Sequence, residues 1–161
     1  MDTLTAAERS QRMALVRGEN TTPEMIVRRL TYSLGFRYRL HQRDLPGKPD
    51  LVFRSRRKVI FVHGCFWHRH DDPECKLARL PKSRVDFWRG KLQGNRERDL
   101  RTQAALRAMG WGFLLVWECE TQPKKRTRLA QKIEGFLRAG QDPLKTPATA
   151  VPVESKPLGK E

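Results

Sequence analysis

Apolar residues recur every three or four positions in several segments of the chain, which is the pattern of an amphipathic helix. The segment with the clearest ends begins at Thr22 and Pro23 and stops at Gly35. Thr can cap a helix, Pro suits its first position, and Gly suits its left-handed end. Spacing and start signals predict further helices: a basic one over 5–17, one that begins with 84–88 behind a Ser83 cap, one over 95–109, and one marked by Leu129, Ile133, Phe136 and Leu137.

Short apolar runs between these segments predict strands. The run 59–62 is expected to be the most buried strand, with further strands over 50–53 and 112–117. Residues 36–40 alternate like a strand with one wet face, and 54–58 form a polar hairpin connection. Helices and strands in this order indicate an α/β domain around a mixed sheet.

Composition sets the bounds of this domain. The chain has 161 residues, which suffice for one domain with a real core, predicted over 1–140. The Pro, Thr, Ala and Lys content beyond Gly140 predicts a disordered tail over 141–161. We expect a cytoplasmic protein, because no apolar run approaches the length of a membrane span and the N-terminus lacks an apolar signal core.

Charge points to the partner. The net charge is +15, from 33 basic and 18 acidic residues, and the tail contributes none of the excess. A body this basic is expected to bind a polyanion such as nucleic acid. The alternative is a solvated basic surface that serves solubility.

The segment 63–70 holds the most informative chemistry. It contains three of the four histidines and follows the buried run 59–62 directly. Imidazoles and thiolates bind transition metals, and imidazoles move protons near neutral pH. Phe66 and Trp67 stand in the same loop, so the segment suits a flat, anionic substrate.

Asp50 is a candidate ligand for Mg²⁺. It begins one predicted strand, and the next strand leads into His63, so both can lie at one edge of the sheet. Mg²⁺ needs only one or two protein carboxylates, and a backbone carbonyl of the neighbouring strand is a possible second ligand. Phosphodiester hydrolysis also needs a base and an acid, for which His63 and His68 are available. Alternatively, Asp50 is a turn carboxylate after Pro49.

The cysteines point to a second metal. Three cysteines cannot form a fully paired disulfide framework, and with a histidine they make a closed tetrahedral Zn²⁺ site of the structural type. The predicted ligands are Cys65, His70, Cys75 and Cys119. Two alternatives stay open: three unrelated thiols, or His68 in place of His70 as the ligand.

Three aromatic residues could sense base pairing. Phe66 and Trp67 lie beside charged residues in a loop, and Trp88 lies in a predicted helix where it could instead be buried. Apolar side chains can wedge between base steps, and a mismatch opens at lower cost than a paired base.

Several of these segments together resemble one known family, the very-short-patch repair (Vsr) DNA mismatch endonucleases. The likeness covers roughly residues 10–138, and its most specific parts are 63–68 (HGCFWH) and 116–119 (VWEC). It also includes 87–88 and 95–99. The resemblance implies a fold like type II restriction endonucleases with a structural zinc. It further implies Mg²⁺-dependent nicking 5′ to the thymine of T·G mismatches, which arise when 5-methylcytosine deaminates.

The resemblance also assigns roles to residues. It implies Asp50 as metal ligand, His63 and His68 as active-site histidines with His68 the base, and Glu24 as an acidic residue near the site. It implies the zinc ligands and the intercalating aromatics already named. Val62 stands where Thr is expected, which is harmless if the metal contact is a backbone carbonyl. The residues 71–74 make the interval between His70 and Cys75 longer than expected.

The expected partners are double-stranded DNA with a T·G mismatch and, functionally, a cytosine-5 DNA methyltransferase, with no membrane and a monomeric protein. The main alternative is a zinc-stabilised DNA-binding module without catalysis. A more distant one is a nuclease that cuts both strands of paired DNA.

Overall fold

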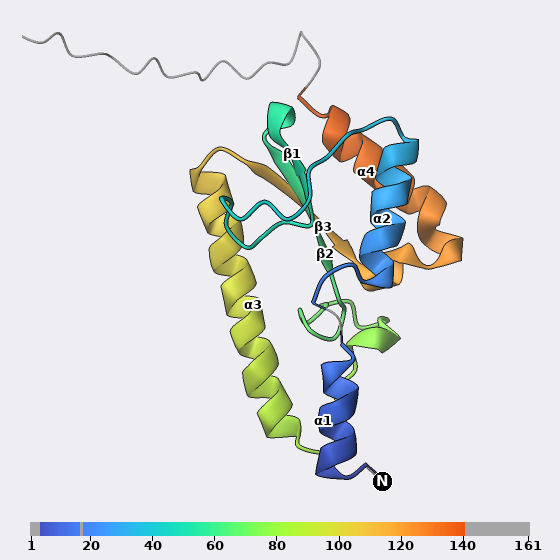
Figure 1. Ribbon diagram of the computed structural model, residues 1–161, viewed down its shortest axis with the longest axis vertical. Coiled ribbons are helices and arrows are strands. Elements are labelled where there is room, and N and C mark those ends of the chain that lie inside the picture. The colour runs from blue at the N-terminus through green and yellow to red at the C-terminus, as the bar shows by residue number, and fades with distance from the viewer. Residues whose placement is uncertain (1–3, 17, 141–161) are drawn as a thin grey trace, which may run out of the picture.

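A mixed three-stranded sheet lies at the centre of the molecule (Figure 1). The computed structural model describes residues 4–16 and 18–140, so the tail predicted over 141–161 lies outside the described residues. β1 (Leu51–Phe53) pairs antiparallel with β2 (Lys58–His63), and β2 pairs parallel with β3 (Gly112–Trp117). The central strand β2 therefore ends beside the end of β3, and both run into loops that carry chemistry.

The described part of the chain has four α-helices, and three of them cover the two faces of this sheet. The four are α1 (Ala6–Ala14), α2 (Thr22–Ser33), α3 (Val85–Ala108) and α4 (Arg126–Arg138). In Figure 1, α3 lies on one side of the sheet and α2 and α4 on the other, while α1 lies near the start of α3. The predicted α/β class with a mixed sheet is confirmed.

Alternation along the strands divides the core into two layers. Leu51 and Ile60 pack with α2 and α4, whereas Val52 and Val59 pack on the other face, where Leu106 of α3 lies. Successive side chains of a strand point to opposite faces, so both faces of the short sheet are buried. Burial of these apolar side chains fixes the strand register, and the register fixes what lies at the strand ends.

Two helix starts differ from the prediction. Thr21, not Thr22, caps α2, and its hydroxyl accepts the N–H of Glu24 at 3.4 Å. Ser83 does not cap α3, because Arg84 occupies the cap position in a left-handed conformation without a side-chain cap bond. The local residue types were suitable, but the path of the preceding loop selects the cap.

The two helical segments predicted at 84–88 and 95–109 are one continuous helix, α3, of 24 residues. Gly90 and Gly94 lower helix propensity in the middle, yet Leu92 between them is fully buried and holds the helix together. Residues 36–40 do not form the predicted strand. Arg39 alone bridges to Val52, with two backbone hydrogen bonds of 2.9 Å.

Among residues 4–16 and 18–140, no helix is both long and apolar enough to span a membrane.

Candidate active site and metal cluster

A cleft of about 1070 Å³ opens where α2, the end of β2 and α3 approach one another. Its lining includes Asp50, which precedes β1, together with His63, which ends β2. It also includes other residues for which the sequence predicted catalytic roles or metal contacts: Glu24, Val62 and His68. The structure therefore brings these residues to one place.

Asp50 is held by the register of the β1–β2 pair. Its backbone N–H donates to the carbonyl of Ile60 at 3.1 Å, and its Oδ2 accepts the N–H of Val62 at 2.6 Å. Burial raises the pKa of Asp50 to about 7, and the nearby Glu24 carboxylate raises it too, against the lowering effect of the Val62 hydrogen bond. Val62 touches Asp50 through its backbone, which valine supplies as well as threonine does.

The two histidines predicted for the active site lie face to face. The rings of His63 and His68 stack with centroids 3.9 Å apart and planes 8° from parallel. Burial is the main cause that lowers the pKa of His63 to about 4, and the adjacent His68 contributes to the same shift. His63 is therefore neutral at pH 7. Its Nδ1 is buried without a hydrogen-bond partner in the described part of the structure.

His68 has a carboxylate partner that sequence reasoning missed. Its Nδ1 lies 2.6 Å from Oδ2 of Asp99, on α3. This contact fixes the ring and leaves Nε2 as the nitrogen that can exchange a proton. Asp99 belongs to the segment 95–99 that supported the resemblance, and this was the signal available for it.

Glu24 lies in the first turn of α2 and is only 6% exposed. Its Oε2 accepts the backbone N–H of Asn20 at 2.8 Å and faces Nη2 of Arg28 at 3.3 Å. Arg28 also lines the cleft and was not among the predicted site residues.

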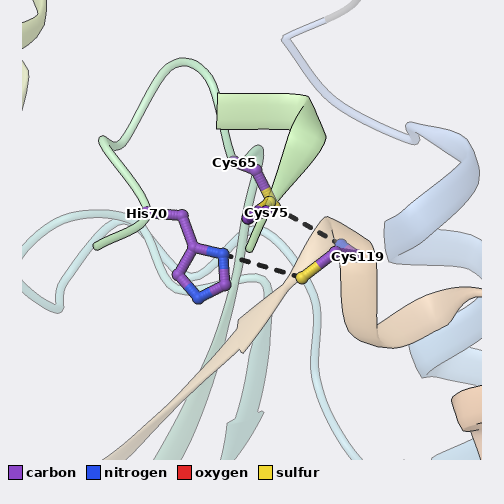
Figure 2. Close-up of side chains that lie close together, drawn as sticks. All are labelled: Cys65, His70, Cys75 and Cys119. Atoms are coloured by element: carbon purple, nitrogen blue, oxygen red, sulfur yellow. Dashed lines mark hydrogen bonds between the residues drawn. The ribbon is translucent and has the colours of Figure 1, made fainter. Parts of the chain in front are cut away.

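The four predicted zinc ligands come together from two segments, the connection after β2 and the residues just after β3 (Figure 2). One ligand atom from each of Cys65, His70, Cys75 and Cys119 lies within 4.8 Å of the others. The N–H of Cys119 donates to Sγ of Cys65 at 3.4 Å, and Sγ of Cys119 lies 3.6 Å from Nδ1 of His70. Three thiols and one imidazole are a donor set that fits Zn²⁺.

Burial, a ring contact and a turn hold the residues of this cluster in place. Burial raises the pKa of the Cys65 and Cys119 thiols. The ring of His70 stacks on Trp117 at 4.3 Å, which orients it. The longer interval before Cys75 forms a turn, since the N–H of Cys75 donates to Asp72 O at 3.0 Å.

The three predicted intercalating residues form one aromatic cluster. Phe66 lies 5.1 Å from Trp67 and 5.4 Å from Trp88, measured between ring centroids. All three are half-buried, and the Lys91 ammonium lies 5.7 Å from both indole rings. Asn95 of α3 donates to the carbonyl of Trp67 at 3.1 Å, which ties the loop to the helix. Trp88 is thus not a core residue of the sheet.

The amino-acid sequence is similar to those of known proteins. A sequence profile described as DNA mismatch endonuclease Vsr matches residues 1–76. The type II nicking enzyme V.XorIIP of Xanthomonas oryzae pv. oryzae is 54% identical over 119 residues, which cover 74% of this chain and 85% of that protein. The DNA mismatch endonuclease Vsr of Escherichia coli is 38% identical over 134 residues, which cover 81% of this chain and 84% of that protein.

A third relative covers still more of the chain. The type II nicking enzyme V.NmeAIP of Neisseria meningitidis is 39% identical over 141 residues, which cover 88% of this chain and 97% of that protein. Identity at this level, over nearly all of the described body, establishes common descent and confirms the resemblance read from the motifs. The chain belongs to the Vsr family of DNA mismatch endonucleases, and it is a DNA endonuclease.

Proposed function

We propose that this endonuclease nicks duplex DNA 5′ to the thymine of T·G mismatches by Mg²⁺-dependent phosphodiester hydrolysis. Such mismatches follow deamination of 5-methylcytosine, so the protein would act in DNA repair beside a cytosine-5 DNA methyltransferase, as a monomer. The observation that carries the catalytic part is one cleft that holds the Asp50 carboxylate, the Val62 backbone and the His68–Asp99 pair. A mixed sheet with this edge suits the proposed restriction-endonuclease-like fold.

The donor set fits a hard divalent cation. Asp50 supplies a half-buried carboxylate beside the Val62 backbone, and Glu24 adds a second carboxylate in the same cleft. Mg²⁺ prefers such oxygen ligands and keeps positions for water and phosphate. When bound, the cation would supply charge stabilisation for the phosphate and acidify a water. We assign the cation to Asp50 and the backbone carbonyl of Val62.

The two histidines take different parts in this proposal. His68 accepts a proton from the attacking water at Nε2, and Asp99 stabilises the resulting imidazolium through Nδ1, which lies 2.6 Å away. His63 has a pKa lowered to about 4, so it is a poor proton donor at pH 7. Its neutral ring is suited to hydrogen-bond the phosphate and to support His68 by stacking.

Mismatch sensing would come from the aromatic cluster of Phe66, Trp67 and Trp88. Rings that are half-buried against one another form a preorganised wedge for the base stack. Zn²⁺ in the Cys65, His70, Cys75 and Cys119 cluster would hold the loop that carries Phe66 and Trp67. This structural role explains why a nicking enzyme keeps a metal site apart from its catalytic cleft.

The catalytic part is tested with Asp50→Asn on a T·G duplex in Mg²⁺. We expect the parent protein to nick one strand and to stop when EDTA is added in excess over Mg²⁺. The variant should bind the duplex but nick at least about 100-fold more slowly, because the metal ligand is lost while the basic surface remains. Parent-like turnover by Asp50→Asn contradicts the assignment, and binding by the parent without any nicking favours the non-catalytic module.

A further inference from the structure

Arg28 is a buried cation in the wall of the catalytic cleft. It lies one helical turn after Glu24 on α2, with Nη2 3.3 Å from Oε2 of Glu24. Arg28 is 7% exposed and Glu24 6% exposed, so neither side chain is a solvated surface group. Arginine is seldom buried unless its charge is paired with a carboxylate or a ligand.

The guanidinium connects the first turn of α2 to the chain before it. Its Nη1 donates to Oδ1 of Asn20 at 2.8 Å and lies 3.3 Å from Sδ of Met25. Asn20 in turn donates its backbone N–H to Oε2 of Glu24 at 2.8 Å. Asn20, Glu24 and Arg28 thus form a closed triangle of hydrogen bonds, and the triangle fixes the rotamer of Glu24.

This triangle engages only one oxygen of the Glu24 carboxylate. Oε2 receives both bonds, whereas Oε1 receives none from any residue in 4–16 and 18–140. Oε1 is therefore the oxygen that a ligand in the cleft can use. Asp50 lines the same cleft. The charge of Glu24 raises the pKa of the Asp50 carboxyl, and the charge of Arg28 lowers it.

The burial of Arg28 is unfavourable for folding at one atom of its guanidinium. Nε of Arg28 is buried without a hydrogen bond in the described residues. A buried, unsatisfied donor is unfavourable for folding, so a position with no ligand to hold would favour an apolar residue. A site that must hold two carboxylates ready for a cation gives Arg28 a reason.

We propose that Arg28 is a positioning residue for the catalytic divalent cation, which acts by locking Oε2 of Glu24 so that Oε1 faces the cation site beside Asp50. This inference rests on the proposed function, because it assumes a cation between these carboxylates. It deepens that function by assigning the residue that preorganises the second carboxylate. Arg28 acts through Glu24 and touches neither substrate nor cation.

The test measures Mn²⁺ binding to zinc-loaded protein by titration calorimetry, without DNA, for the parent, Arg28→Lys, Glu24→Gln and the double variant. Lysine keeps the charge but lacks the planar fork in which two separate nitrogens reach Asn20 and Glu24. We expect Arg28→Lys to weaken Mn²⁺ binding about tenfold in the parent background and less than about twofold in the Glu24→Gln background. The Mg²⁺ concentration for half-maximal nicking should rise in parallel, with DNA affinity unchanged.

The matched control is Arg29→Lys, the adjacent exposed arginine of α2, which should bind Mn²⁺ like the parent. If Arg28→Lys folds poorly, Asn20→Gly is the second variant. It suits the left-handed φ of 56° at Asn20, keeps the backbone N–H and removes the side chain whose Oδ1 accepts from Arg28. Weaker Mn²⁺ binding by Asn20→Gly, without a lower melting temperature, supports the inference.

Three outcomes overturn it: Arg28→Lys that lowers the melting temperature but not Mn²⁺ affinity, equal losses in both backgrounds, or Glu24→Gln that binds Mn²⁺ like the parent. These outcomes leave the proposed function standing if Asp50→Asn abolishes Mn²⁺ binding. If Asp50→Asn also binds Mn²⁺ normally, the metal assignment itself fails.

Discussion

His68 and His70 lie two residues apart, yet they have different partners, in keeping with the different roles that we propose for them. His68 contacts Asp99 and stacks on His63, whereas His70 lies against Cys119 in the thiol cluster. A zinc-bound imidazole cannot take a proton from water, so the two roles cannot be shared.

We therefore predict opposite phenotypes for two substitutions. His68→Ala should keep its zinc and its melting temperature but lose about 10²–10⁴-fold in nicking rate, the usual range for a general base. His70→Ala should lose zinc and thermal stability first. Zinc content, melting temperature and single-turnover nicking are measured for both variants. If His68→Ala is the one that sheds zinc, the roles are swapped.

At the residue scale, the sequence predicted best where chemistry and spacing coincide. Cysteine number and histidine clustering predicted the four residues that the fold gathers, including distant Cys119, although His68 stayed open as an alternative to His70. Asp99 lay in the segment 95–99 that supported the resemblance but was given no role, and Arg28 could not be predicted as a site residue, because charged residues are common on helix faces. Only the packing of α3 and α2 against the strand ends shows which ones face the cleft.

At the element scale, the loop after β2 and the helix α3 act as one unit. Asn95 of α3 holds the Trp67 carbonyl, and the Trp88 ring packs against Phe66. These contacts hold the aromatic cluster against α3, which suits the proposed wedge that tests the stability of a base pair.

The corresponding prediction concerns the double variant Phe66→Ala/Trp67→Ala. It should lose most of its preference for T·G over T·A duplexes, while general affinity falls less because phosphate contacts supply most of it. Competition binding with both duplexes measures the preference. Tyr32→Ala, at an exposed ring on α2, is the control. A double variant with the parent's full preference rules out the wedge.

α3 also offers a matched pair of arginines. Arg98 lines the cleft, whereas Arg101, also exposed and one turn further on, does not. If DNA enters the cleft, Arg98→Ala should lower the slope of log affinity against log salt by about one, and Arg101→Ala should leave it nearly unchanged. Binding of one duplex at several salt concentrations measures the slopes. Equal slopes for the two variants would place the DNA elsewhere.

Element prediction failed where local signals were ambiguous. Gly90 and Gly94 interrupt the apolar spacing, so the sequence predicted two helices. The structure has one continuous helix, α3, in which Leu92 between the glycines is buried. Residues 36–40 alternate properly but make only the bridge at Arg39, and His41 then turns with a φ of 52°. The strands β2 and β3 were predictable because apolar runs buried on both faces leave little choice.

At the scale of the whole molecule, the thiol cluster joins the two segments that follow the neighbouring ends of β2 and β3. Cys65 and His70 follow β2, and Cys119 follows β3, so one ion would clamp loops that are more than 40 residues apart in sequence. Metal binding in such a site is coupled to folding.

We predict about one tightly held zinc per chain and a lower melting temperature, with less zinc, for Cys119→Ser. Metal analysis of the purified protein and thermal unfolding measure both. The control is Cys119→Ser against the parent after zinc is stripped, when the two melting temperatures should converge. Purified parent protein without zinc contradicts the assignment.

The whole molecule combines a basic body, a catalytic cleft and an aromatic cluster beside it. The net charge of +15 provides affinity for any duplex, so specificity must come from the other two parts. The central claim is therefore that catalysis depends on the mismatch and not on DNA alone.

The most direct test is single-turnover nicking in Mg²⁺ of two duplexes that differ only in one T·G or T·A pair, with the nick mapped on both strands. The set includes several flanking sequences, each with both pairs. The account predicts a nick on the thymine strand, 5′ to the mismatched thymine, and at least about 100-fold slower cleavage of the T·A duplex, which corresponds to about 2.7 kcal/mol. Equal rates on the two duplexes, or cleavage of both strands, would contradict it.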